Sequence, residues 1–351
     1  MNYINRFILS CFKHEEHMRA STLYHLLKGK KTASTLTYGY FYQLLPYYYL
    51  YPHLEETDYQ QILRELVQEE CLFQVEEGVY RITDTGMILV AEQPIQMIGL
   101  DKIRYWKYDI SFWQKILFIT QIFSEKQHGN ARYWPIESNP YKQQIVKQWL
   151  GQQADDVIVS FYKEWVSIVQ SLPEERELFL TYQLVGHDMT GQTLYQLGQE
   201  RGMSSYESEF VFLDTWHSVM THLSFQPDKY PLFLSLLALD SQANKKDTTE
   251  ITFDYFSKGL SIHDIGVQRQ LKNSTITDHI LEYYLTNMAT GAELFLTEET
   301  KEAMSVYYSN HPEFKHWRFK ECHSVFPKLS FYQFRFYQYY LTEQEGTGWK
   351  R

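Results

Sequence analysis

Cysteine is scarce in this chain of 351 residues, and long hydrophobic runs are absent. Cys11, Cys71 and Cys322 lie far apart, whereas a disulfide framework or a structural zinc site would need more ligands at closer spacing. No apolar run approaches the roughly 18 residues that a membrane-spanning helix needs. The segment Met1–Lys13 lacks the long apolar core and the small-residue cleavage site of a signal peptide. These absences predict a soluble cytoplasmic protein with free thiols.

Motifs for catalysis and nucleotide binding are also missing. The stretch Gly29–Thr32 ends like a phosphate-binding loop, but Tyr24 stands where that loop needs glycine, and Lys31 where it needs serine or threonine. The chain has no G-x-S-x-G, H-E-x-x-H or G-x-G-x-x-G motif. His14 and His17 lack a third metal ligand, which favours a solvated helix face. We therefore expect no catalytic residue, no cofactor, no metal and no small-molecule substrate.

Glycine (16 residues) and proline (10 residues) are sparse, whereas aromatic residues make up 17% of the chain. A chain so rich in aromatic residues is not disordered over long stretches. Its apolar residues recur mainly with the period of a helix rather than alternating as in a strand. The sequence therefore predicts a mainly α protein with one small β-hairpin. Its net charge of −10 argues against nucleic-acid binding through bulk charge, although one local basic face remains compatible with it.

Residues 1–95 have the pattern of a winged-helix-like domain. Helices are predicted at Leu23–Leu27, at Leu36–Leu45 and, after a Thr57-Asp58 cap, at Tyr59–Val67. Two β-rich runs around Glu77-Gly78 then predict a hairpin, and three helices before a hairpin is the order of a winged helix. Residues 1–35 carry six basic and two acidic residues. They predict a basic DNA-binding face that comprises Arg19, Lys28, Lys30 and Lys31.

Residues 96–245 are predicted to form a helical middle domain. Its expected helices cover residues 103–124, 141–150, 155–171 and 174–185. Core packing is the preferred interpretation of their tryptophans over base stacking, and these residues are Trp106, Trp113, Trp149 and Trp165. The polar stretch 241–247 is the best linker candidate. It leads into a third predicted domain at residues 246–351.

The most informative segment is residues 251–285. Ser261, with Asp264 three residues later, predicts the start of a helix whose Ile262, Ile265 and Val267 point partly inward. Gly266 marks a place where two helices approach closely. The spacing that follows is that of a helix-turn-helix, in which Leu271 fills the turn.

The second helix of this motif is expected to begin with Asn273 or Ser274 as its cap. In a helix-turn-helix, the second helix enters the major groove with its N-terminal residues first. Hydroxyl, amide and free N–H groups there make good phosphate contacts. We therefore predict DNA contacts from Lys272, Asn273, Ser274, Thr275 and Thr277.

The pattern Gly259–Ile280 closely resembles the helicase-associated helix-turn-helix at the C-terminus of many bacterial RecQ-type helicases. The resemblance continues through Gly291 and Leu296-Thr297 to Leu329–Arg335. Residues 62–67, 72, 80–83 and 86 resemble the winged helix of the RQC domain of such helicases. The whole chain is similar to the YpbB family of Firmicutes, stand-alone proteins encoded next to a short RecQ-type helicase. One departure is the hairpin tip Glu76-Glu77-Gly78, which is acidic where some RQC domains carry an aromatic wedge that parts DNA strands.

This resemblance implies a non-enzymatic DNA-binding accessory protein. Its partners would be a RecQ-type helicase and a DNA fork or junction, in DNA repair or recombination. Two alternatives remain open. One is a helix-turn-helix transcription regulator, because response-regulator motifs share the Ser-Thr-Ile pattern followed by histidine. The other is a protein-interaction scaffold without nucleic-acid binding, which the net charge of −10 favours.

Overall fold

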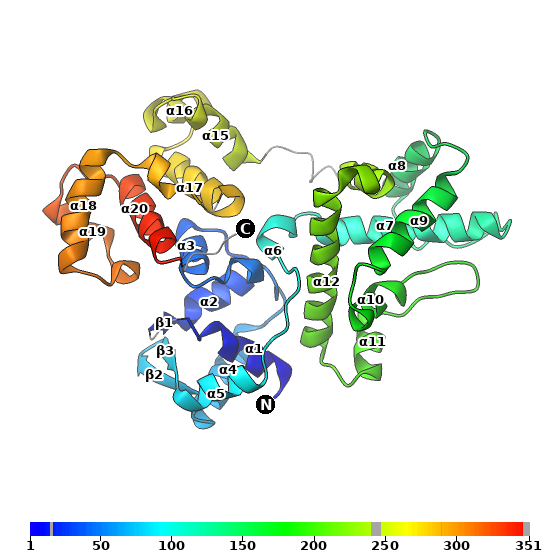
Figure 1. Ribbon diagram of the computed structural model, residues 1–351, viewed down its shortest axis with the longest axis horizontal. Coiled ribbons are helices and arrows are strands. Elements are labelled where there is room, and N and C mark those ends of the chain that lie inside the picture. The colour runs from blue at the N-terminus through cyan, green and yellow to red at the C-terminus, as the bar shows by residue number, and fades with distance from the viewer. Residues whose placement is uncertain (15–16, 240–246, 289, 347–351) are drawn as a thin grey trace. The chain divides into compact units, whose positions relative to one another are not determined.

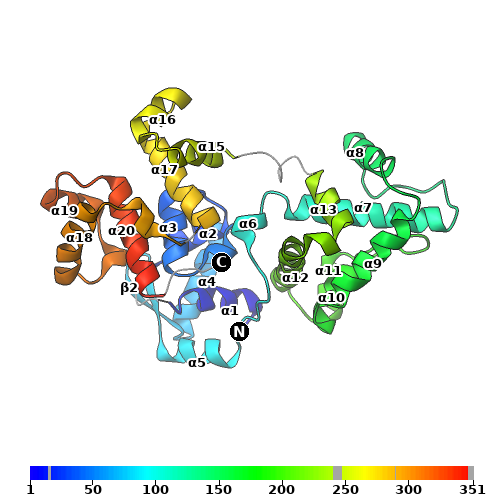
Figure 2. The ribbon, with the colours of Figure 1, turned by 45° about the horizontal axis from the view of Figure 1, so that its top comes forward.

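The computed structural model describes residues 1–14, 17–239, 247–288 and 290–346, and this part of the chain is mainly helical. The described residues contain one small antiparallel sheet beside the helices (Figures 1 and 2). The prediction of a mainly α protein with a hairpin is confirmed. Within the described ranges, no helix has both the length and the apolar character needed to cross a membrane.

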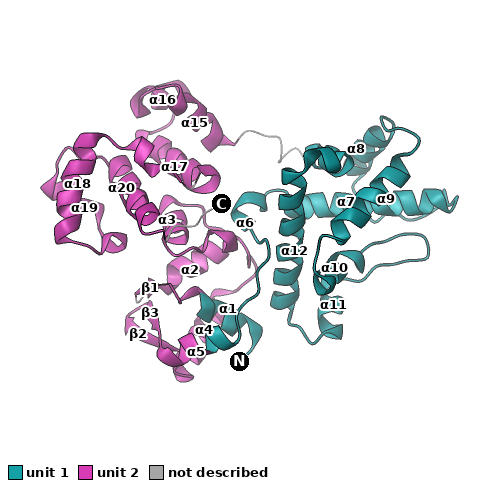
Figure 3. Ribbon diagram, viewed as in Figure 1, with its two compact units in different colours: residues 1–10, 89–245 teal, residues 11–88, 246–351 magenta. Residues whose placement is uncertain are grey.

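The chain divides into two compact units, and each unit combines segments that are distant in sequence (Figure 3). Unit 1 comprises residues 1–10 and 89–245, and unit 2 comprises residues 11–88 and 246–351. The first and the last of the three predicted domains therefore fall largely within unit 2. The boundaries at residues 95 and 245 stay predictions. Apart from Asp247, the predicted linker at 241–247 lies outside the described residues.

The described part of unit 1 is mainly helical, and Trp113 and Trp165 lie in its core. The Trp113 ring lies 5.0 Å from that of Trp216 and 6.3 Å from that of Trp165. Three of the four tryptophans predicted to be in the core are buried, whereas Trp106 is half-buried. The helices are α1 (Tyr3–Cys11, which extends one residue into unit 2), α6 (Lys102–Tyr105), α7 (Asp109–Gln127), α8 (Pro140–Leu150), α9 (Val157–Val169), α10 (Glu174–Thr181), α11 (Leu194–Glu200), α12 (Ser205–Phe225) and α13 (Pro231–Ala238).

A buried polar cluster joins α6, α7 and α12. Lys102 Nζ lies 2.6 Å and His217 Nε2 lies 3.1 Å from the same oxygen, Oδ2 of Asp109. The backbone N–H of Asp101 donates to His217 Nδ1 at 3.1 Å, so the ring of neutral His217 carries its proton on Nε2. Burial lowers the pKa of His217. These pairings give buried charged and polar groups the partners that they require, which assigns the cluster a structural role.

The N-terminal part of unit 2 has a winged-helix-like arrangement. Its helices are α2 (Ala20–Leu27), α3 (Ala33–Phe41) and α4 (Glu56–Gln68), followed by β2 (Leu72–Glu76), β3 (Val79–Ile82) and α5 (Asp84–Glu92, which continues into unit 1). The predicted hairpin is present, and the short strand β1 (Met18–Arg19) extends the sheet in the order β1-β3-β2.

Two details of this region differ from the prediction. The cap position of α4 is Glu55 rather than Thr57-Asp58, because the helix starts at Glu56. Glu56 and Asp58 lie in its first turn, where the helix dipole favours acidic residues. The elements α1, β1 and α5 were not predicted. Phe7, Ile8 and Leu9 are consecutive and all fully buried, which hides any helical period, and two residues are too few for a strand to show alternation.

Of the C-terminal helices, α17 (Asn273–Tyr283) and α20 (Phe331–Gln344) pack on α3 within unit 2 (Figures 1 and 2). Tyr339 links them, because its ring lies 5.4 Å from those of Tyr40 and Tyr284, and its hydroxyl lies 2.7 Å from Thr37 Oγ1. The helices in the C-terminal part of unit 2 are α15 (Thr248–Ser257), α16 (Ile262–Arg269), α17 (Asn273–Tyr283), α18 (Glu298–Asn310), α19 (Phe319–Val325) and α20 (Phe331–Gln344). Tyr284–Met288 forms a π-helical turn, and 3₁₀ turns cover Leu45–Tyr47, Pro227–Lys229, Ala292–Phe295 and Phe314–His316.

Candidate nucleic-acid interface

The helices α15, α16 and α17 form a helix-turn-helix unit around fully buried isoleucines, Ile265, Ile276 and Ile280. Ser261 caps α16 as predicted, because its Oγ accepts the backbone N–H of Asp264 at 3.1 Å. The Ser261 hydroxyl also donates to the Asp264 carboxylate at 2.7 Å. These contacts fix the start of the first helix of the motif.

The turn between α16 and α17 passes close to Gly266, as predicted. The Leu271 backbone N–H donates to the Gly266 carbonyl at 2.9 Å, and Gln270 adopts a left-handed conformation with φ of 54°. A Cβ at Gly266 would lie only 3.0 Å from the Leu271 carbonyl oxygen, so the two segments approach closely. The predicted inward position of Val267 is wrong, since its side chain is 67% exposed. Two residues along a helix rotate a side chain by about 200°, which places Val267 opposite the buried Ile265.

The start of α17 presents the predicted DNA-binding residues. Lys272, Asn273 and Ser274 are exposed, whereas Thr275 and Thr277 are half-buried. The predicted cap at Asn273 or Ser274 is wrong, because Lys272 occupies the cap position and no side chain caps the helix. Asn273 is the first helical residue, and its Oδ1 lies beside Gly266.

An uncapped helix start leaves backbone N–H groups available to an anion. At the start of α17, the backbone N–H of Ile276 donates to the Lys272 carbonyl at 3.0 Å. The N–H groups of residues 273–275 precede it and, by the geometry of an α-helix, have no carbonyl partner within the helix. Together with the Lys272 ammonium group and the Ser274 hydroxyl, they provide donors suited to phosphate oxygens.

The far end of α17 has different electrostatics. Glu282 is paired with Lys31, whose Nζ lies 2.5 Å from its carboxylate. Lys31 Nζ also lies 3.7 Å from Asp247. Asp278, between the two ends, has a pKa that burial raises. Arg269 faces α15 rather than solvent alone, because it donates to the Thr248 carbonyl at 2.6 Å.

The predicted basic face of the N-terminal segment is spread over separate places. Arg19 is the N-cap and Lys28 the C-cap of α2, so about 12 Å of helix lies between their backbones. Lys30 is exposed in the turn before α3, whereas Lys31 is half-buried against Glu282. Since ten residues separate Glu282 from Lys272, Lys31 lies roughly 15 Å along α17 from the candidate phosphate donors.

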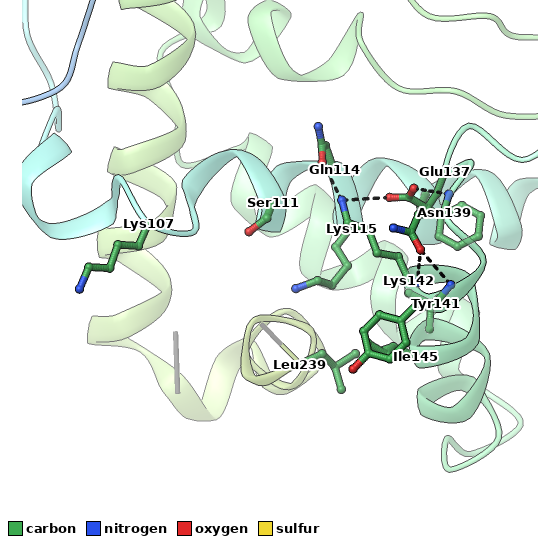
Figure 4. A pocket seen from close by; sticks show the side chains of 12 residues that line it. Lys107, Ser111, Gln114, Lys115, Glu137, Asn139, Tyr141, Lys142, Ile145 and Leu239 are labelled. Carbon is green, nitrogen blue, oxygen red and sulfur yellow. Dashed lines mark hydrogen bonds and ion pairs between the residues drawn. The ribbon is translucent and has the colours of Figure 1, made fainter. Parts of the chain in front are cut away.

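Unit 1 contains a pocket of about 300 Å³ between α7, α8 and Leu239 (Figure 4). Lys107, Lys115 and Lys142 contribute to its lining. Lys142 Nζ lies 3.4 Å from the Glu137 carboxylate, and Asn139 accepts the backbone N–H of Tyr141 at 2.9 Å to cap α8. These contacts account for part of the polar lining structurally. Among the described residues, no group of three His, Cys, Asp or Glu side chains is arranged to hold a metal ion.

Residues 248–338 match a protein family described as a helix-turn-helix domain. The match covers the three helices of the candidate interface and extends into α20. Over 295 residues, the chain is 23% identical to Protein YpbB of Bacillus subtilis strain 168. That similarity covers 81% of this chain and 83% of the relative. No solved structure matches the chain.

Proposed function

We propose that this chain, a relative of the YpbB family, is a non-enzymatic DNA-binding accessory protein. Its similarity to Protein YpbB spans four-fifths of its length. It works with a RecQ-type helicase on forks or junctions during DNA repair or recombination. The helix-turn-helix supplies the DNA contact. Catalysis and strand separation belong to the helicase.

The observation that carries this proposal is the exposed start of α17. An uncapped helix N-terminus, the ammonium group of Lys272 and the hydroxyl of Ser274 lie together at the start of the second helix of a helix-turn-helix. A helix dipole and free N–H groups attract a phosphate, and Lys272 adds a full positive charge. Segment 258–283 has three basic and three acidic residues, so the contact is local and does not depend on bulk attraction.

The accessory protein acts by adding a second attachment point. The helicase and this chain form one complex, and each holds one part of a fork. Once one of them has bound the DNA, binding by the other is an intramolecular event. Two weak contacts then give a long-lived complex without new chemistry. The net charge of −10 keeps the affinity of the isolated chain for random duplex low, which favours DNA that the helicase already holds.

The direct test is binding of the full chain to labelled duplex and forked DNA, measured by fluorescence anisotropy at several salt concentrations. The double variant Lys272→Ala, Ser274→Ala should weaken binding about tenfold and reduce the salt dependence. Lys320→Ala, which removes an exposed lysine from α19, is the matched control and should bind like the wild type. Equal affinity of all three proteins would contradict DNA contact at α17.

The helicase partnership needs a separate measurement. The full chain and the RecQ-type helicase of the same cell are combined, with and without forked DNA, and analysed by size exclusion with light scattering. A stoichiometric complex supports the accessory role. Two separate peaks under both conditions contradict it. A dimer of this chain that binds one palindromic site tightly would instead establish a transcription regulator.

A further inference from the structure

The outer face of the hairpin in unit 2 carries exposed apolar side chains. Phe73 and Val75 both lie on β2 and are 51% and 38% exposed, and the pairing of β2 with β3 shifts register between Gln74 and Glu76. Arg81 is the cross-strand neighbour of Phe73, and its guanidinium lies 5.1 Å from the centre of the Phe73 ring. This cation–π contact restrains an exposed aromatic ring, so little entropy is lost when a partner covers it.

Acidic residues are concentrated in the chain segment that contains the hairpin. Residues 55–82, from the cap of α4 to the end of β3, include eight acidic and two basic residues, a net charge of −6. The middle segment 96–245 is five times longer and carries only −4, from 17 acidic and 13 basic residues. Seven of the eight acidic residues of segment 55–82 are exposed. The exposed residues are Glu55, Glu56, Asp58, Glu69, Glu70, Glu76 and Glu77.

These charges decide which partner can cover the apolar side chains. Duplex or single-stranded DNA would bring phosphates against a segment in which acidic residues outnumber basic residues by eight to two, which is unfavourable. A second copy related by a two-fold axis through this face would place two such acidic segments against each other. A basic protein surface satisfies the charge, and an apolar side chain on it can pack on Phe73 and Val75.

We propose that the hairpin face, defined as Phe73, Val75 and the exposed carboxylates of Glu69, Glu70, Glu76 and Glu77 in and directly before the hairpin, is a docking site for a basic protein segment that carries an apolar anchor. This inference deepens the proposed function, on which it rests for the existence of a protein partner. Unit 2 then divides two tasks between two elements. The start of α17 contacts DNA, and the winged helix contacts protein.

The test measures binding of the full chain to two probes. One is the RecQ-type helicase of the same cell, and the other is a fluorescein-labelled peptide of lysine and arginine with a central leucine. Two variants alter the hairpin face. The apolar hairpin variant combines Phe73→Ser with Val75→Ser. The carboxamide variant combines Glu69→Gln, Glu70→Gln, Glu76→Gln and Glu77→Gln. Two matched controls alter exposed residues elsewhere, namely Val306→Ser with Val325→Ser, and Asp155→Asn with Asp156→Asn, Glu174→Gln and Glu175→Gln.

The apolar hairpin variant should bind both probes about tenfold more weakly. The carboxamide variant should bind several-fold more weakly and lose salt dependence, because its charge attraction is removed. Both control variants should stay within about twofold of the wild type. Thermal unfolding is measured for every variant, and these exposed substitutions should leave the melting temperature nearly unchanged.

The possible failures can be told apart. Wild-type binding to the peptide but not to the helicase would contradict the helicase partnership and leave the hairpin face supported. Hairpin variants that bind both probes as the controls do would overturn the docking site, as would a wild type that binds neither probe. A loss of affinity for duplex DNA in the hairpin variants would also overturn it, since the face would then contact nucleic acid.

Discussion

The start of α17 and the hairpin face belong to the same compact unit, and both are built from elements that DNA-binding proteins use. Their surfaces differ sharply in charge. Segment 258–283 around α17 has equal numbers of acidic and basic residues and exposes Lys272 at an uncapped helix start. Segment 55–82 carries a net charge of −6 and exposes Phe73. One surface is suited to phosphates and the other repels them.

This difference shows that a local architecture does not specify its ligand. A helix presented by a turn, or a hairpin beside a helix, is a scaffold on which either a nucleic-acid or a protein contact can be built. The side chains at the exposed positions decide between the two. Four pairs of measurements test whether the two regions differ in this way.

The largest effect is expected from a closely packed glycine in or next to each region. A Cβ at Gly86 would overlap the Cys71 carbonyl oxygen and lie 2.8 Å from Ile82 Cγ1. Gly86→Ala should therefore destabilise unit 2 by about 1–3 kcal/mol. At Gly266 the nearest atom is the end of the flexible Asn273 side chain, at 2.8 Å. The better helix propensity of alanine, about 1 kcal/mol, should offset most of the cost of Gly266→Ala. Urea unfolding followed by circular dichroism tests this order, which equal losses would contradict.

The second comparison concerns DNA affinity. Lys272→Ala should weaken duplex binding by about three- to tenfold and lower the slope of log affinity against log salt by about one, since one phosphate contact is lost. Arg64 is the only basic residue of α4, and it is exposed. Arg64→Ala should leave DNA binding unchanged if α4 faces protein. Weaker binding of the Arg64 variant in anisotropy would mean that the winged helix also contacts DNA.

A third pair separates two lysines that the sequence alone treats as equivalent. Lys31 is half-buried and paired with Glu282, so Lys31→Ala should cost about 0.5 kcal/mol of stability. Lys30 is exposed, and Lys30→Ala should leave the free energy of unfolding unchanged. Chemical denaturation of the two variants beside the wild type measures the difference. Equal stability of the two variants would mean that the ion pair between Lys31 and Glu282 does not contribute to the free energy of unfolding.

The smallest effect concerns pH. Burial, followed by the charge of Arg269, lowers the pKa of His279 on α17 below its usual 6.5. The unfolded chain therefore takes up this proton first as the pH falls. The contribution of His279 to stability is present above about pH 6.5 and is lost as the pH drops towards its folded-state pKa. Segment 55–82, which includes α4, has no histidine. Lowering the pH to 5.5 should therefore reduce the hydrogen-exchange protection of α17 more than that of α4, once the protection is corrected for intrinsic exchange rates. His279→Gln should remove the difference.

Much of the secondary structure followed from local patterns. The hairpin at residues 72–82 was predicted because β-rich runs flank Glu77-Gly78, and Gly78 indeed adopts a positive φ of 72°. The cap at Ser261 and the close approach at Gly266 were also recovered, since both are set by residues a few positions apart. The cap of α17 was missed, because Asn273 lies beside Gly266 instead of capping the helix.

Candidate site residues were harder to predict, because a sequence shows charge without partners. Lys28, Lys30 and Lys31 form one basic run, yet Lys31 is paired with a glutamate 251 positions away in the chain. Arg19 was grouped with them, although α2 lies between Arg19 and Lys28. The concentration of acid in segment 55–82 could have been counted from the sequence. Its exposure, and the exposure of Phe73 within it, could not.

Local sequence patterns were enough to predict the helical class, the hairpin and the helix-turn-helix, because helical periodicity, turn residues and caps act over a few neighbouring residues. The folded structure alone shows that α3 and α20 share an aromatic core through Tyr40 and Tyr339, which joins residues 11–88 to residues 246–351 in unit 2. It alone also shows which charges are paired and which apolar side chains stay exposed. Those properties depend on contacts between residues that are distant in the chain, and no local pattern encodes them.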